Sequence, residues 1–143
     1  MFHEHRTDVS GQSTADLEAE YAADLAAIVD EQGVDTVVAQ TGLDRETVER
    51  IADEEIPETL ALTDAAAIQA LADGVADADT VYEMACEHLL LGMTTGVMDV
   101  EAVAANLDVD LGPTEVQQKI ERRAPMTFHE FVDIQHAIAS RQR

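Results

Sequence analysis

The sequence has little of several residue types that define common protein classes. It contains no tryptophan, two tyrosines, three phenylalanines and one cysteine among 143 residues. A lone Cys86 excludes an internal disulfide and a cysteine-based zinc site, and its apolar surroundings, MACEHLLLGM, favour simple packing. The longest apolar run, around Leu89 to Leu91, is far shorter than the roughly 20 residues that span a bilayer. The N-terminus has no apolar targeting core, so we expect a cytoplasmic protein with no membrane contact.

Catalytic motifs are also absent from the sequence. There is no glycine-rich phosphate loop, no nucleophile elbow and no histidine that can be assigned to Cys86 as a base. The carboxylates are scattered at spacings typical of solvated helix surfaces. We therefore expect neither an enzyme nor a bound cofactor.

Basic residues are scarce as well. Lysine and arginine together number 8 against 30 acidic residues, which gives a formal net charge of −22. The acidic residues are spread through segments with regular apolar spacing, unlike those of disordered acidic tails. This pattern is typical of the acidic surface of a halophilic protein, and multimolar salt shortens the screening length to roughly 3 Å. On this interpretation the net charge reflects adaptation to a salty habitat and does not indicate which partner the protein binds.

The periodicity of apolar residues predicts an all-α protein of about eight helices. Ser13 is expected to cap a first helix, which Gly33 ends in the left-handed conformation. Further helices are predicted over 35–40, from the Asp44 cap to a stop at Pro57, and from Thr63 through Leu71. The inward positions of the first helix are Leu17, Tyr21, Leu25, Ile28 and Val29.

The second half repeats this order. Helices are predicted over 80–93, 100–107 and 114–123, and a last one follows Thr127, whose capping box with Glu130 precedes a core of Phe128 and Phe131. Nine positions separate a valine from a proline in both VERIADEEIP and VQQKIERRAP, and an Ile-Gln pair follows each proline. We predict two helix-turn-helix-like units from an internal duplication. Their expected bounds are a flexible N-terminus over 1–12, a first unit over 13–72, a linker over 73–79 and a second, divergent unit over 80–143.

The stretch VVAQTGLDRETVERI, residues 37–51, resembles the helix-turn-helix of the Cro/repressor-like family over about Val34 to Leu71. The resemblance is carried by the TGL turn, the Asp44 cap, Val48 and Ile51. It implies that the helix after the turn enters the major groove of DNA, with Arg45 and Arg50 on bases. The implied DNA-facing set is Thr41, Asp44, Arg45, Glu46, Glu49 and Arg50.

The whole chain also resembles an uncharacterised haloarchaeal domain family, judged from its MFHEHR start, its acidic helical body and its TGLDRETV turn. That resemblance implies habitat and compartment and assigns no activity.

A local basic cluster stands out in this acidic chain. Lys119, Arg122 and Arg123 fall within about one helical turn, and we consider two roles for them: holding DNA phosphates, or pairing with Glu121 and neighbouring acidic helices. The preferred hypothesis is a DNA-binding regulator of transcription. The alternative is an acidic adaptor that has kept the fold but no longer binds DNA. It would bind another protein through apolar positions near Leu89 to Met98.

Two further segments have candidate roles. His129, Asp133 and His136 share a helix face at spacings that suit a divalent metal, although two surface histidines without a fourth ligand are the commoner situation. In the region from Val81 to Met98, apolar residues cover more of the helix surface than a single core-facing stripe. We therefore expect this helix either to be buried between the two halves or to pair with a second subunit in a homodimer.

Overall fold

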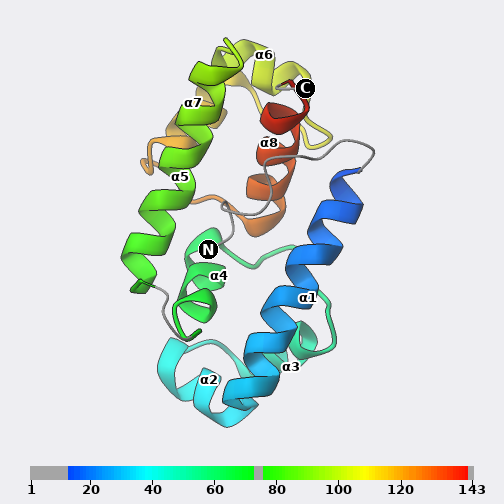
Figure 1. The fold of residues 1–143 in the computed structure, drawn as a ribbon, viewed down its shortest axis with the longest axis vertical. Coiled ribbons are helices and arrows are strands. Elements are labelled where there is room, and N and C mark those ends of the chain that lie inside the picture. Colours follow the sequence, from blue (N-terminus) through cyan, green and yellow to red (C-terminus); the bar gives the residue numbers. More distant parts are fainter. Residues whose placement is uncertain (1–12, 73–75, 142–143) are drawn as a thin grey trace.

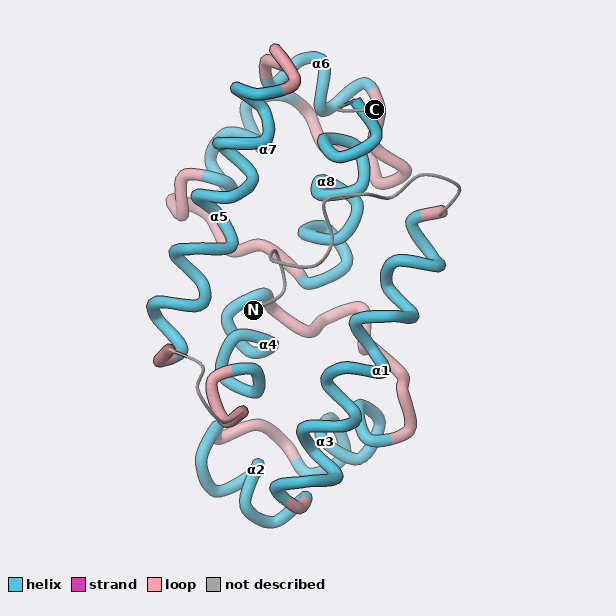
Figure 2. The backbone as a smooth tube through the Cα atoms, in the orientation of Figure 1, coloured by secondary structure: helices cyan, strands magenta, loops and turns pink. Residues whose placement is uncertain are grey.

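The computed structural model describes residues 13–72 and 76–141, so the predicted flexible N-terminus over 1–12 and residues 73–75 of the predicted linker lie outside the described residues. Within them the chain forms eight helices and no strand, which confirms the all-α prediction (Figure 2). The helices are α1 (Thr14–Gln32), α2 (Val34–Thr41), α3 (Arg45–Ala52), α4 (Leu62–Gln69), α5 (Ala78–Thr95), α6 (Val100–Ala105), α7 (Pro113–Ile120) and α8 (Phe128–Arg141). No described helix is long and apolar enough to cross a membrane.

The helix boundaries follow local capping signals. The Ser13 hydroxyl accepts the Asp16 N–H at 3.1 Å, and the Asp16 carboxylate accepts the Ser13 N–H at 3.2 Å, so the predicted start of α1 is confirmed. The same reciprocal pair forms at α8, where Thr127 and Glu130 bond each other's N–H at 3.1 and 2.9 Å. Each pair satisfies amides that the first helical turn leaves without partners.

Several predicted boundaries were wrong. Helix α4 begins at Leu62 instead of Thr63, because the Asp64 carboxylate bonds the Ala61 N–H at 3.2 Å. Helix α3 ends at Ala52, five residues before Pro57, and α5 begins at Ala78, inside the predicted linker. Helix α6 ends at Ala105 instead of residue 107, and α7 ends at Ile120 instead of residue 123. Gly33 has a positive φ of 89°, but its ψ of 142° is extended, so it does not adopt the predicted left-handed helical conformation.

The two halves are packed on one another around a single core. Helix α4 packs against α5, and α1 packs against α8, so helices from both predicted units meet (Figure 1). The buried residues form one cluster to which all eight helices contribute. At its centre the segments before α4 and α8 pair as an isolated antiparallel bridge between Ala61 and Thr127. Phe128 donates its N–H to Leu60 O at 2.7 Å, and Leu62 donates to Met126 O at 2.8 Å.

Local geometry recurs at matching places in the two halves. Helices α3 and α7 each end in a turn with one residue at positive φ, Glu54 at 62° and Arg122 at 64°. The N–H of the next residue then donates to the carbonyl oxygen five residues earlier. In the first half Glu55 N–H donates to Arg50 O at 2.9 Å, and in the second half Arg123 N–H donates to Gln118 O at 2.8 Å. This recurrence is compatible with two related units, and the internal duplication itself stays a prediction.

Candidate functional site

The turn between α2 and α3 is held by the conformation of Gly42 and by the hydroxyl group of Thr41. Gly42 ends α2 in the left-handed conformation, at φ 76° and ψ 7°, where a glycine pays no steric cost. The Thr41 hydroxyl donates to Val37 O at 2.7 Å and accepts the Leu43 N–H at 3.2 Å. Thr41, predicted to contact DNA, therefore uses its hydroxyl to hold the turn.

Helix α3 presents its predicted outer face to solvent. Val48 and Ile51 are fully buried, and Leu43 is partly buried against the same core, as the apolar spacing predicted. Asp44 occupies the N-cap position, but its side chain accepts no capping hydrogen bond, which corrects the predicted cap. The predicted DNA-facing positions of α3 and its cap are all exposed: Asp44, Arg45, Glu46, Glu49 and Arg50.

Both arginines of this face are engaged by carboxylates of the same chain. Arg45 forms an ion pair with Asp35 of α2, and Arg50 Nε lies 3.4 Å from a Glu55 carboxylate oxygen. The two arginine side chains stay about half exposed, at 54% and 49%. The same surface carries three exposed carboxylates, those of Asp44, Glu46 and Glu49, beside the two paired arginines.

The three residues of the basic cluster, Lys119, Arg122 and Arg123, lie in three different environments. Lys119 Nζ donates to Pro125 O at 3.0 Å and to Glu130 at 2.9 Å, and both side chains of this ion pair are only 16% exposed. Arg123 pairs with Glu121 at 2.5 Å. Arg122 lies beyond the end of α7, and no hydrogen bond or ion pair of its side chain is found within the described chain. Internal pairing therefore accounts for two members of the cluster.

The two predicted DNA-contacting groups lie far apart. Helix α3 is near the lower end of the long axis, whereas α7 is in the upper part of the molecule (Figure 1). The nine predicted residues thus form two separate surfaces.

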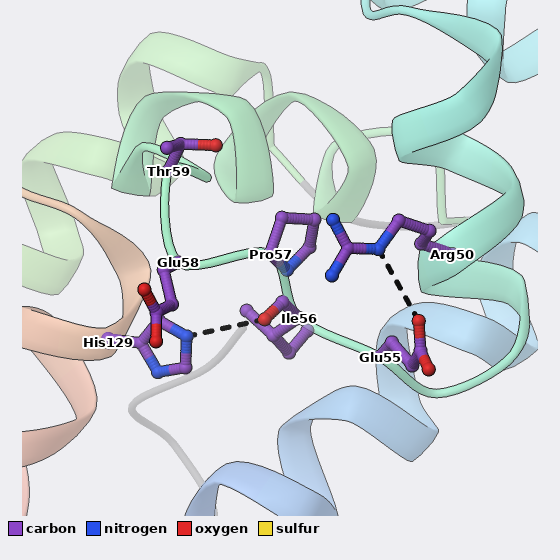
Figure 3. Close-up of a pocket in the computed structure, with 7 residues that line it drawn as sticks. All are labelled: Arg50, Glu55, Ile56, Pro57, Glu58, Thr59 and His129. Atoms are coloured by element: carbon purple, nitrogen blue, oxygen red, sulfur yellow. Dashed lines mark hydrogen bonds and ion pairs between the residues drawn. The ribbon is translucent and has the colours of Figure 1, made fainter.

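A surface hollow that the sequence did not reveal adjoins the end of α3 (Figure 3). Its volume is about 570 Å³, with the Arg50 guanidinium at one end and the His129 ring at the other. His129 Nε2 lies 3.3 Å from Ile56 O, and its Nδ1 pairs with Glu18 of α1. The lining residues are Arg50, Glu55, Ile56, Pro57, Glu58, Thr59 and His129. His129 stands 73 residues from Ile56, so no local sequence pattern joins them.

Two of the three predicted metal ligands on α8, Asp133 and His129, make other contacts. Asp133 is 3% exposed, and its carboxylate accepts the N–H groups of Asp108 and Val109, each at 2.9 Å at the closest. His129 bonds α1 and the loop before Pro57, as described above. Among the described residues no group of three His, Cys, Asp or Glu side chains is placed to hold a metal ion. Within that part of the chain, His129, Asp133 and His136 do not form such a group.

The pair between Glu18 and His129 joins α1 to α8 in a partly buried place. Burial raises the pKa of the Glu18 carboxyl above its usual range, and the His129 charge and hydrogen bond oppose that rise. The pair links α1 to α8 at a place where burial disfavours the charged carboxylate.

Helix α5 buries one stripe and exposes another. Val81, Ala85 and Leu89 are buried, as is Cys86, whose burial raises its thiol pKa to about 11. The predicted packing role of Cys86 is confirmed, since a protonated, buried thiol is a poor nucleophile. Three large apolar side chains near the C-terminal end of α5 face solvent: Leu90 and Leu91 on the helix, and Val97 just beyond its last residue, Thr95. We refer to these three residues as the α5 patch. They are the exposed large hydrophobic residues of the described chain, at 44%, 63% and 85% exposure.

Comparison with known proteins gives a family assignment without a function. The sequence model of a family of unknown function, DUF5791, matches residues 17–141. No curated protein and no solved structure matches the chain.

Proposed function

We propose that this chain, which belongs to the DUF5791 family of unknown function, is a protein-binding adaptor built on a helix-turn-helix-like scaffold. The α5 patch carries this proposal. Its three members lie within Leu89 to Met98, the segment where the adaptor hypothesis expects its sensitive positions. Exposed apolar surface of this kind is typical of regions that bind another protein.

The charges on α3 support the same proposal. Contacts between basic side chains and phosphates supply much of the affinity of DNA-binding proteins. Here Arg45 and Arg50 are paired with carboxylates, and Lys119 is largely buried in its pair with Glu130. The α3 surface then offers phosphates an excess of negative charge, whereas a protein partner needs no net positive field.

Photocrosslinking from the α5 patch tests the adaptor. A photoreactive amino acid at position 91 of the full chain, introduced in the source cells, is expected to give a discrete protein–protein product. The matched control carries it at position 39, an exposed residue of α2 outside the patch. Products from position 91 and not from position 39 support the adaptor. Equal labelling from both positions, or none from position 91, contradicts it.

A DNA-binding regulator is the second candidate, and one observation favours it. Arg45 and Arg50 remain about half exposed on the helix that follows the Gly42 turn. Exposed ion pairs contribute roughly 0–1 kcal/mol, so DNA can displace the two carboxylates at little cost.

For the regulator we expect the double variant Arg45→Ala, Arg50→Ala to lose site-specific DNA binding without a lower free energy of unfolding. Each bidentate arginine contact with a base discriminates by about 1–3 kcal/mol, so removing both corresponds to a loss of roughly 30-fold or more. The measurement is recovery of crosslinked DNA from the source cells, with stability checked by salt-matched denaturation. The paired variant Asp35→Ala, Glu55→Ala frees the arginines and should strengthen binding. Unchanged DNA recovery in the arginine variant would contradict the assignment.

A further inference from the structure

We propose that the α5 patch binds a second copy of this chain, so that two chains pack through the C-terminal half of α5 about a twofold axis. This inference rests on the proposed function, because it names the partner of the same patch. Three independent features of the segment from Leu89 to Met98 support it: its charge, its backbone conformation and the hollow beside it.

The first feature is the absence of charge. The ten residues from Leu89 to Met98 include no Asp, Glu, Lys or Arg, in a chain whose formal net charge is −22. Thr94 and Thr95 donate their hydroxyls to carbonyls of their own helix at 3.2 and 2.9 Å, so these donors need no outside partner. Two equally acidic molecules can meet closely only where carboxylates do not face each other, since like charges in an interface cost several kcal/mol. A basic partner is instead expected to bind where carboxylates are dense.

The second feature is the conformation of Val97. This residue has a φ of 53°, and its side chain is 85% exposed. Positive φ is unfavourable for a β-branched residue, and glycine adopts it freely. Glu54 and Arg122 also have positive φ, but neither is β-branched. An exposed apolar side chain gives this strained turn no benefit within the monomer, and burial against a second molecule supplies one.

The third feature is a hollow of about 260 Å³ between α5 and the end of α7. Leu90 and Ile120 give it apolar walls, and three charged residues share the lining: Glu87, Arg122 and Glu121, which is paired with Arg123. In the described structure Arg122 has no ion pair within its own chain. In a twofold arrangement every contact occurs twice, so a leucine of each copy can enter the hollow of the other, and each Arg122 can approach the other copy's Glu87.

Light scattering and sedimentation equilibrium of the full chain in concentrated salt test this inference. A patch of three large side chains predicts a weak dimer, so protein concentrations up to about 1 mM are needed. The weight-average mass should rise from 15.5 kDa toward twice that value. Leu91→Glu should weaken association by about tenfold or more, because it places two carboxylates at the centre of the contact. Ala39→Glu adds the same charge to exposed α2 and should associate like the unaltered chain.

A second variant separates the interface from folding. Val97→Gly removes the side chain and relieves the positive φ, so it should weaken association several-fold while the protein unfolds no more readily than before. Loss of both association and stability would instead make Val97 a residue of the monomer fold, and association that survives Leu91→Glu would contradict the location. If the mass stays that of one chain at every concentration and position 91 crosslinks to a different protein, the proposal of self-association is wrong and the adaptor proposal stands. A single-chain mass without any such crosslink would overturn both.

Discussion

Truncation of Phe128 to alanine is expected to lower the free energy of unfolding by about 3–5 kcal/mol, the cost typical of removing a buried aromatic ring. The Phe128 side chain is fully buried where α1, α4 and α8 meet. Its ring is edge-on to Tyr21, with centroids 5.6 Å apart, and stacks on Phe131 at 6.0 Å. These three are the buried aromatic rings of the described residues, and the surrounding close-packed side chains can fill the space left by Phe128 only in part.

Chemical denaturation in a fixed, concentrated salt buffer measures this loss. Phe128→Leu is the matched control, because it retains much of the apolar volume and should cost less than about 1.5 kcal/mol. Small domains have stabilities of about 5–15 kcal/mol, so the alanine variant should unfold at a much lower denaturant concentration. A loss below about 1 kcal/mol for Phe128→Ala would show that the aromatic cluster is not the centre of the core.

The features predicted successfully from the sequence are those encoded by neighbouring residues. Ser13 caps α1 as expected, and Thr127 forms the expected capping box with Glu130, three positions away. The inward positions of α3 and α8 follow the helical period. Such features depend on the geometry of one helical turn, so a single sequence is enough to predict them.

The sequence did not identify partners that only the tertiary structure brings together. Internal pairing was one of the two roles considered for Lys119, but its partner, Glu130 of the next helix, could not be named from the sequence. The same limit applies to His129, whose partner Glu18 lies on the first helix. No spacing rule connects such positions, since the loops that place them have no regular period.

The prediction for the apolar surface of α5 was only partly confirmed, for the same reason. The apolar residues of Val81 to Met98 are too many for one stripe, and the structure buries Leu89 while it exposes Leu90 and Leu91. The sequence indicated that some apolar side chains need a second surface to pack on. It did not identify which ones, because that depends on where α4, α7 and α8 lie against the helix.

Asp133 illustrates a tertiary contact with a large expected effect. Its carboxylate is almost fully buried and accepts two backbone N–H groups of the loop between α6 and α7: Asp108 at 2.9 and 3.2 Å, and Val109 at 2.9 Å. Hydrogen bonds to a charged group contribute about 1.5–3 kcal/mol each, and loss of the acceptor leaves the amides to find other partners. We expect Asp133→Ala to lower the free energy of unfolding by about 2–4 kcal/mol.

The comparison with Asp110→Ala separates this role from a general charge effect. Asp110 lies in the same loop, is exposed, and carries the same charge, so its removal should change stability by less than about 0.5 kcal/mol. Hydrogen exchange gives a second, local measurement: the amides of Asp108 and Val109 should exchange faster in Asp133→Ala and at the original rate in Asp110→Ala. Equal destabilisation by both variants would assign the effect to net charge. Slow exchange retained in Asp133→Ala would show that the loop is held by its apolar contacts, and not by the carboxylate.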